Sequence, residues 1–226
     1  MENPKISVVI PAKNEAHTIG EVIRKSRPHA HEVLVIDGSS TDGTKQIAQE
    51  EGAKVVIDGG TGKGKAIRLG IDKASGDIIV FIDADGSHDA DDIPKLTQPM
   101  LNGSKADMVI ASRGLGGSDE LRGDFDKFLR RTGSDIINLG INMRWNQRLT
   151  DAQNGFRAIR KEVAKSLALK ENITTIEQEM VMKALKKGYR IAEVASHEYA
   201  RKHGDSVIVL GKVWPRYLFS FIKNLF

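Results

Sequence analysis

Two carboxylates stand directly behind a stretch of sequence that predicts a fully buried strand. The segment IIVFIDADGSHD, residues 78–89, runs from β-branched and aromatic residues into Asp83 and Asp85. A solvated turn would account for two such aspartates, and the D-A-D triplet alone is a weak signal. Ligands of α/β proteins, however, bind at the carboxyl ends of strands. Paired carboxylates at such an end could hold a divalent cation against a diphosphate.

Other predicted strand ends also carry small or polar residues. IPAKNE closes the first strand, VIDGSSTDGT the second and GTGKGKA the third. Adjacent carboxyl ends of parallel strands line one crevice, and a nucleoside diphosphate fits there. Asp37 can accept hydrogen bonds from a base edge, while Lys63 and nearby backbone amides such as that of Gly64 can face phosphate.

These strand ends depend on a sheet that the first 112 residues predict. KISVVIP, EVLVID, KVVI, DIIVFID and DMVIAS read as strands, and helices are expected near 14–26, 41–51, 62–74 and 92–101, the first capped by Asn14. Continuous β-branched runs joined by crossover helices indicate parallel strands with both faces covered. We therefore expect an α/β fold with a mostly parallel central sheet and helices on both faces.

The alternation stops after residue 112. Residues 125–141 predict a helix, 155–167 a strand leading into a helix, and 175–188 an amphipathic helix closed by glycine, with a last strand near 189–196. We expect one domain over 1–211, with a nucleotide-binding half of about 1–112 and an acceptor half of about 113–211. An amphipathic tail follows at 212–226.

Composition narrows the class of protein. A chain of 226 residues can bury one substantial core. Its net charge of +4 favours anionic partners, but basic stripes with interleaved aromatics are absent, so we expect no nucleic-acid partner. Cysteine is absent, which excludes disulfides. We find no secretory signal and no apolar run of membrane-spanning length, and expect a cytoplasmic protein, soluble or on a membrane surface.

An alternative from a different class is a P-loop ATPase. GGTGKGKA, residues 59–66, nearly spells a phosphate-binding loop. A P-loop needs a serine or threonine hydroxyl for magnesium where this chain has Ala66, and it should open the sheet, whereas two strands come first. Preference for a nucleoside triphosphate over a nucleotide sugar would identify this alternative.

Taken in order, the motifs resemble the family 2 glycosyltransferases of the GT-A fold. The match runs through SVVIPAKNE, VLVIDGSSTDGT, GKGKAIRLGIDKASGDIIVFIDADGSHD and ASR. The resemblance implies that Asp37 contacts the base, Asp83 the nucleotide-sugar portion and Asp85 the metal, with both Asp83 and Asp85 available to Mg²⁺ or Mn²⁺. It also implies a lining for the nucleoside pocket: Pro11, Asn14 and Glu15.

The implied reaction explains why carboxylates stand there. Breaking the anomeric C–O bond leaves oxocarbenium-like charge on the sugar and negative charge on the departing diphosphate, which a bound metal neutralises. We expect an inverting, metal-dependent transfer from a donor of the GDP-mannose or UDP-glucose type.

The second half of the chain narrows the class of acceptor molecule. DAQNGFRAIRK, residues 151–161, and the segment 175–206 resemble the polyprenol-phosphate sugar synthases, the branch of dolichol-phosphate mannose synthase. Members usually carry serine where this chain has Asn154. The resemblance implies a polyprenyl or dolichyl phosphate acceptor at the cytoplasmic membrane face. A soluble alcohol or phosphorylated metabolite is the alternative acceptor.

Arginines could bind an acceptor phosphate, since guanidinium grips phosphate in a planar fork. Arg113 follows a strand end, Arg130 and Arg131 share one helical turn, and Arg201 lies in a loop before GDS. We assign Arg113, Arg131 and Arg201 to the site. Asp151 would be the general base toward an alcohol, but an ionised phosphate needs none, and Asp151 would then only position groups.

The tail GKVWPRYLFSFIKNLF mixes aromatic and cationic residues. Such a segment could lie in a membrane interface, giving peripheral contact with the membrane, or could pack on the domain or on a second subunit. The sequence leaves these alternatives open, as it leaves open the oligomeric state, the base and the sugar.

Overall fold

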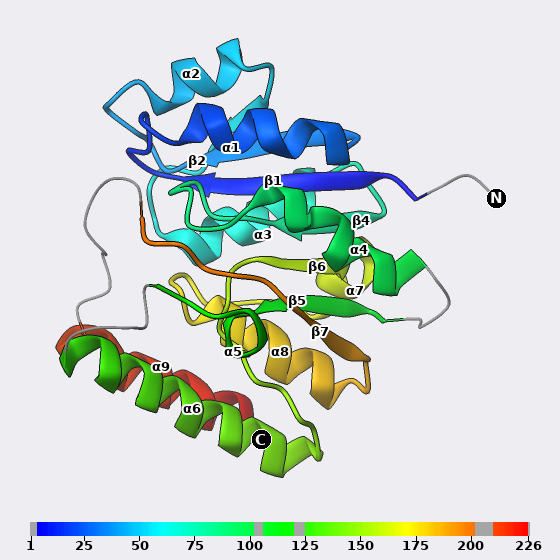
Figure 1. The fold of residues 1–226 in the computed structure, drawn as a ribbon, viewed down its shortest axis with the longest axis vertical. Helices are drawn as coiled ribbons and strands as arrows, with labels where there is room; N and C mark the ends of the chain where they lie inside the picture. The colour runs from blue at the N-terminus through cyan, green and yellow to red at the C-terminus, as the bar shows by residue number, and fades with distance from the viewer. Residues whose placement is uncertain (1–3, 102–105, 120–124, 202–209, 226) are drawn as a thin grey trace.

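The structure, a computed structural model, describes residues 4–101, 106–119, 125–201 and 210–225 (Figure 1). Within these ranges one seven-stranded sheet has the order β3-β2-β1-β4-β6-β5-β7. Its strands are β1 (Ile6–Ala12), β2 (Glu32–Asp37), β3 (Lys54–Ile57), β4 (Ile78–Phe81), β5 (Met108–Ser112), β6 (Arg157–Arg160) and β7 (Ile191–Ala195).

The predicted mostly parallel sheet is confirmed, with one interruption. β1 pairs in parallel with β2 and β4, β2 with β3, and β5 with β7. β6 runs antiparallel between β4 and β5. The strand predicted within 155–167 therefore separates two strands of the first half, and both halves of the chain share one sheet.

Helices cover both faces of the sheet, as predicted. The described helices are α1 (Ile19–Ser26), α2 (Thr44–Glu50), α3 (Lys63–Lys73), α4 (Ile93–Leu101), α5 (Arg113–Gly116), α6 (Phe125–Trp145), α7 (Lys161–Ser166), α8 (Ile176–Lys186) and α9 (Leu210–Leu225), with short 3₁₀ turns at Arg27–His29 and Ala90–Asp92. One core cluster joins α1, α2 and α4 to the sheet, and another joins α3, α6, α7 and α8 to its opposite face.

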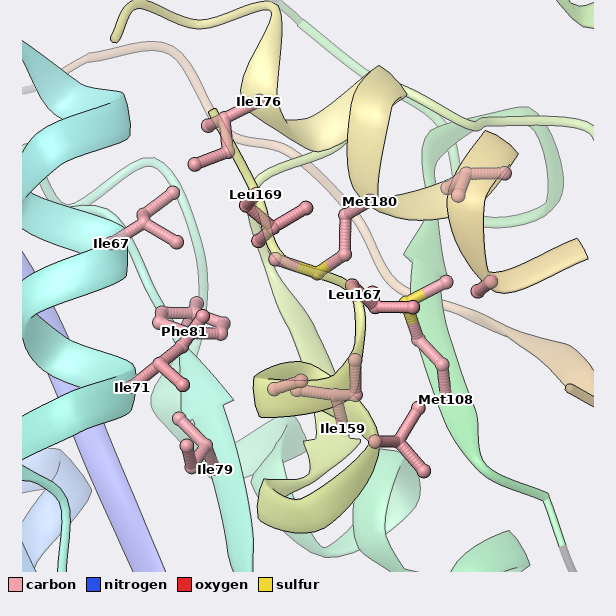
Figure 2. Close-up of a cluster of buried hydrophobic side chains, with 14 of the residues drawn as sticks. Ile67, Ile71, Ile79, Phe81, Met108, Ile159, Leu167, Leu169, Ile176 and Met180 are labelled. Carbon is pink, nitrogen blue, oxygen red and sulfur yellow. The ribbon is translucent and has the colours of Figure 1, made fainter. Parts of the chain in front are cut away.

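Strand residues alternate between these two clusters, as side chains on a pleated strand must. Val8 and Ile10 of β1 enter the first cluster, whereas Val9 enters the second. Figure 2 shows the second cluster, where Ile67 and Ile71 of α3 face the β4 side chains. Apolar residues on both faces of β1 and β4 explain the continuous hydrophobic runs in the sequence.

The prediction of an amphipathic helix in 175–188 is wrong in one respect. From Ile176 to Met182 every residue of α8 is buried, including Glu177, Gln178 and Glu179. The reason is a second layer of helices, because α8 packs against α6 and α9 as well as β7. Three polar side chains are thus carried into the interior, where they need partners.

Two further expectations concern helix ends. Asn14 does not cap α1, which begins at Ile19 after Thr18. The Asn14 side-chain oxygen instead accepts the backbone N–H of Thr41 at 2.9 Å. The predicted tail forms α9, and Tyr217 ties it to the domain by donating its hydroxyl hydrogen to the Thr174 hydroxyl at 2.9 Å.

Candidate active site

The carboxyl ends of three neighbouring strands form the centre of the site. β1 and β2 are in register, with Ala12 opposite Asp37, and β4 pairs with the other side of β1. Asp83 and Asp85 follow the end of β4. The parallel register therefore places the polar residues that follow each strand at one edge of the sheet, as the sequence predicted.

Asp37 keeps one carboxylate oxygen without a protein partner. The residue is buried, and its Oδ2 accepts the backbone N–H of Ser40 at 3.1 Å. Its Oδ1 is also buried and accepts no hydrogen bond from the described residues. Leaving a buried acceptor unsatisfied costs about 1–3 kcal/mol, so this oxygen is suited to an N–H of a ligand.

The loops after β1 and β2 hold one another. Asn14 has a left-handed backbone, φ 57°, and its N–H donates to the Ser40 hydroxyl at 2.9 Å. The N–H of Glu15 donates to the Thr44 hydroxyl at 2.8 Å. Pro11 is half-buried near the end of β1. Asn14 and Glu15 thus fix the loop beside Asp37, and their predicted contact with a nucleoside stays a proposal.

Each aspartate behind β4 has a cation beside it. The Lys63 ammonium lies 2.5 Å from Asp83 Oδ1, and an Arg201 guanidinium nitrogen lies 3.1 Å from Asp85 Oδ2. Asp85 Oδ1 accepts both the N–H and the hydroxyl of Ser87, at 3.0 and 2.7 Å. Each of the two carboxylates thus has a positive charge beside it.

Negative charge is concentrated here. Burial, and next the Asp85 carboxylate, raise the pKa of Glu15 above its ordinary value. Burial alone would raise the pKa of Asp83 too, but the Lys63 ammonium outweighs it, and the pKa is lowered. Burial lowers the pKa of His88 despite the nearby carboxylates. Asp83 therefore stays ionised, and His88 is neutral near pH 7.

The donor set fits a hard divalent cation. Asp83 has a side chain that is 27% exposed, and its contact with Lys63 is made by its Oδ1. Within the described ranges no group of three or more histidine, cysteine, aspartate or glutamate side chains could enclose a metal. Two carboxylates suffice for Mg²⁺, which takes its remaining ligands from substrate phosphates and water.

Lys63 is held between two carboxylates. Its ammonium also lies 3.0 Å from Glu177 Oε1 of α8. Burial alone lowers the pKa of Lys63, but Asp83 and Glu177 outweigh it and raise the pKa well above its ordinary value. A Cβ atom at Gly155 would stand 2.8 Å from the ammonium, so only glycine leaves room for this contact.

Gly64, predicted to face phosphate, has its backbone N–H engaged. It donates to the Asn172 carbonyl at 2.9 Å, and a Cβ atom at Gly64 would stand 2.3 Å from the Glu171 carbonyl oxygen. The glycine is therefore required for close packing of α3 against the segment before α8. This packing argues against a P-loop, whose backbone amides must point at phosphate.

Asp151 is locked to Arg113. Nε of Arg113 donates to Asp151 Oδ2 at 2.6 Å, Nη2 donates to Oδ1 at 2.9 Å, and the Arg113 backbone N–H donates to Oδ2 at 3.1 Å. A third group, Glu198, lies 3.3 Å from Nη1 of the same arginine. Burial alone would raise the pKa of Asp151, but Arg113 outweighs it and the pKa is lowered.

Residues that the sequence reasoning missed hold the segment around Asp151. Asn138 of α6 donates to the Thr150 carbonyl at 2.9 Å and accepts the Ala152 N–H at 2.9 Å. Arg157, fully buried, donates to the carbonyls of Asn154 and Glu177, both at 2.9 Å. Burial lowers the pKa of Arg157 to about 10. Because Arg157 begins a strand that the sequence predicts to be buried, its position could have indicated a buried, hydrogen-bonded arginine.

Arg131 and Arg201, both predicted to belong to the site, lie in different surroundings in the structure. Arg201 lies beside Asp85, with a side chain that is 26% exposed. Arg131 is exposed on α6, and no ion pair or hydrogen bond joins it to another described residue. The side chain of Arg130 lies outside the described residues. The structure therefore brings Arg201, but not Arg131, to the aspartates.

The comparisons with known proteins agree with this geometry. The profile of the family Glycosyl transferase family 2 matches residues 7–168. The chain belongs to this family. Glycosyltransferase AglJ of Haloferax volcanii is 34% identical over 202 residues, which are 88% of this chain and 65% of that protein. The chain thus spans about two thirds of the length of this relative.

Two other similar proteins bear on the acceptor of this family 2 glycosyltransferase. The dolichol-phosphate mannosyltransferase of Pyrococcus furiosus is 30% identical, over 98% of this chain and 63% of that protein. A crystal structure of glucosyl-3-phosphoglycerate synthase from Mycobacterium tuberculosis, in complex with Mn²⁺, UDP and phosphoglyceric acid, is 26% identical. It superposes with a TM-score of 0.79, over 99% of this chain and 79% of that chain. The predicted GT-A fold is confirmed by this likeness.

Proposed function

We propose that this family 2 glycosyltransferase moves a hexose, with inversion, from a nucleoside-diphosphate sugar to a polyprenyl phosphate at the cytoplasmic face of the membrane. The observation that carries the acceptor class is the state of Asp151. Both of its oxygens are engaged by Arg113, and its pKa is lowered by that arginine despite burial. A carboxylate so held is a poor proton acceptor, which suits a nucleophile that is already ionised.

The donor side supports a nucleotide sugar. Asp37 offers a buried, unpartnered oxygen to a base edge, and Asp83 and Asp85 offer carboxylates to a cation. Bound Mg²⁺ or Mn²⁺ would neutralise the charge on the departing diphosphate. The M. tuberculosis synthase has been crystallised with Mn²⁺ and UDP-glucose. A donor of the GDP-mannose or UDP-glucose type is therefore part of the proposal.

The chain's own residues prepare the site for that donor. Lys63 keeps Asp83 ionised and oriented, and Glu177 fixes Lys63 from the opposite side. Ser87 orients Asp85 through two hydrogen bonds. Arg201, beside Asp85, supplies positive charge where the phosphate of an acceptor would approach. These groups bind and orient, whereas none is required to remove a proton from the acceptor.

The lipid acceptor gains support from relatives. Besides the mannosyltransferase of P. furiosus, an undecaprenyl-phosphate 4-deoxy-4-formamido-L-arabinose transferase of Pseudomonas fluorescens is 28% identical over 89% of this chain. Within the described ranges no helix is both long and apolar enough to cross a bilayer.

A soluble phosphorylated acceptor is a second candidate. The likeness to glucosyl-3-phosphoglycerate synthase favours it, because that protein was crystallised with phosphoglyceric acid in the same fold. Such an acceptor, or a soluble alcohol, presents a hydroxyl that has to lose a proton. The two candidates therefore differ in what they demand of Asp151.

A transfer assay with paired acceptors tests the proposal. Labelled GDP-mannose and UDP-glucose are each supplied with Mg²⁺ or Mn²⁺ and with a short-chain polyprenyl phosphate or 3-phosphoglycerate. We expect sugar transfer to the polyprenyl phosphate, and a loss below about tenfold for Asp151→Asn. Transfer only to 3-phosphoglycerate, with a loss of about 10²–10⁴ for the same variant, would overturn the proposed acceptor, since that is the range of general base catalysis.

A further inference from the structure

Two neighbouring helices carry most of the large apolar side chains that the described residues expose. Ile136, Leu139 and Met143 project from α6, with Met143 77% exposed. Leu218, Phe219 and Ile222 project from α9, with Phe219 68% exposed. We call these six residues the outer face. Figure 1 shows α6 and α9 side by side at one edge of the molecule, and the Phe221 ring of α9 packs where a Cβ atom at Gly140 of α6 would stand.

The outer face is additional to the face by which each helix packs on the core. Ile137 and Ile141 of α6 belong to the core cluster, and Trp145, a further four residues along α6, packs against it. Tyr217 and Phe221 of α9 also pack against this cluster. A surface helix of a globular protein normally buries one apolar stripe and exposes polar residues elsewhere. Both helices depart from that rule, and an exposed apolar surface rimmed by polar residues marks an interaction site.

Charge identifies the partner. The exposed charged residues of the described parts of α6 and α9 are the cations Arg131, Arg144, Arg216 and Lys223 and the single carboxylate Asp135. Lys223 is paired with Glu171, at 3.3 Å, so the arginines carry the excess of positive charge. A second copy of the chain, meeting this face across a two-fold axis, would bring the same cations together. An anionic lipid surface instead attracts the cations while its acyl region accepts the apolar side chains.

We propose that the outer face docks this protein on an anionic lipid bilayer, with α6 and α9 lying in the membrane interface. The inference deepens the proposed function, on which its biological purpose rests. It also reassigns the membrane contact from the tail alone to a surface built by two helices far apart in the sequence. α9 alone carries three of the six residues of the outer face.

The position of α6 explains how docking would serve the reaction. Through Asn138, α6 holds the backbone of Thr150 and Ala152, on either side of Asp151. Ser134 of the same helix donates to the Gln153 side chain at 2.7 Å. The helix that carries half of the outer-face residues therefore also holds the segment that contains Asp151. α9 adds a second connection, because Gln178 of α8 donates to the Tyr217 carbonyl at 3.2 Å.

Vesicle co-sedimentation tests the docking surface directly. The full chain is mixed with vesicles of phosphatidylcholine alone or with phosphatidylglycerol added. We expect binding to the anionic vesicles that salt weakens, and a loss of at least about tenfold in partitioning for Leu139→Ser combined with Phe219→Ser. A matched control, Ile57→Ser combined with Leu115→Ser, removes two exposed apolar residues elsewhere and should bind as the unaltered chain does. Thermal unfolding verifies that both variants fold.

A charge variant and a mass measurement complete the test. Arg144→Glu combined with Arg216→Glu should abolish the preference for anionic vesicles. Failure of the unaltered chain to bind either vesicle, or equal loss in the control variant, would overturn the docking proposal. Dimerisation in light scattering that Leu139→Ser combined with Phe219→Ser abolishes would assign the face to a second copy. No sugar is transferred in these measurements, so they stand apart from failure of the proposed acceptor.

Discussion

The two sides of the candidate site treat their carboxylates differently. On the proposed donor side, Asp37 has an oxygen without a partner among the described residues, Asp83 lies beside Lys63, and Asp85 lies beside Arg201. On the proposed acceptor side, Asp151 receives three hydrogen bonds from one arginine, which also lies close to Glu198.

This difference suggests that the aspartates of the first side can exchange their ion-pair partners, whereas the Asp151–Arg113 pair stays fixed. An aspartate with one cation beside it can accept a metal when the donor brings compensating charge. A buried carboxylate bound bidentately loses several kcal/mol if its arginine leaves, so it stays in place through the reaction. We infer that donor binding rearranges ion pairs, whereas the acceptor segment is preformed.

The largest effect is expected at the donor side. Asp85→Asn should reduce transfer at least about 10³-fold while leaving the far-UV spectrum unchanged, because a carboxamide is a poor ligand for a hard cation. Turnover with Mg²⁺ and with Mn²⁺ provides the measurement. Asp72→Asn, at an exposed position on α3, is the matched control. Near-normal turnover of the folded Asp85→Asn chain would remove the metal assignment.

On the acceptor side the expected loss is of stability. Arg113→Ala leaves Asp151 and Glu198 buried without their cation and should lower the free energy of unfolding by about 3–5 kcal/mol. Urea unfolding measures it. Arg113→Lys keeps the charge but not the planar fork, so we expect an intermediate loss. If Arg113→Ala unfolds as the unaltered chain does, the acceptor segment is not the preformed region described above.

A smaller effect is expected for Arg201, which lies beside Asp85. Arg201→Ala should weaken saturation by the acceptor by about 1.5–3 kcal/mol, the value of a charged hydrogen bond, with donor binding near normal. Steady-state kinetics with both substrates varied provides the test. Arg131→Ala is the comparison, since this arginine is exposed on α6 and forms no ion pair with Asp83 or Asp85, both among the described residues. Equal weakening by both changes would restore Arg131 to the site.

The smallest effect concerns acid stability. The folded-state pKa of Asp151 lies below its ordinary value of 3.8, so its ionised form favours the folded state. This stabilisation is complete above the unfolded-state pKa and disappears as pH falls through the folded-state pKa. As the pH is lowered from 5 through the folded-state pKa, the free energy of unfolding measured in urea should therefore fall less for Asp151→Asn than for the unaltered chain. Parallel curves would contradict the lowered pKa.

Much of the donor side could be predicted from the sequence. Runs of β-branched residues predict buried strands, and parallel pairing brings the carboxyl ends of these strands together. Asp37, Asp83 and Asp85 needed only that rule. The surroundings of Lys63 could not be predicted in this way. Its ammonium lies 3.0 Å from Glu177, which is 114 positions further along the chain, and the glycine-rich loop gives no indication of that contact.

The sequence by itself determined the family, the α/β class and the row of polar strand ends, because these depend on local periodicity and on motif order. Only the tertiary structure decided that β6 inserts between β4 and β5, that α8 is buried on all sides from Ile176 to Met182, and that Asp151 is bound to Arg113. Those outcomes depend on contacts between residues far apart in the chain, where burial and charge pairing are set by neighbours that no local pattern names.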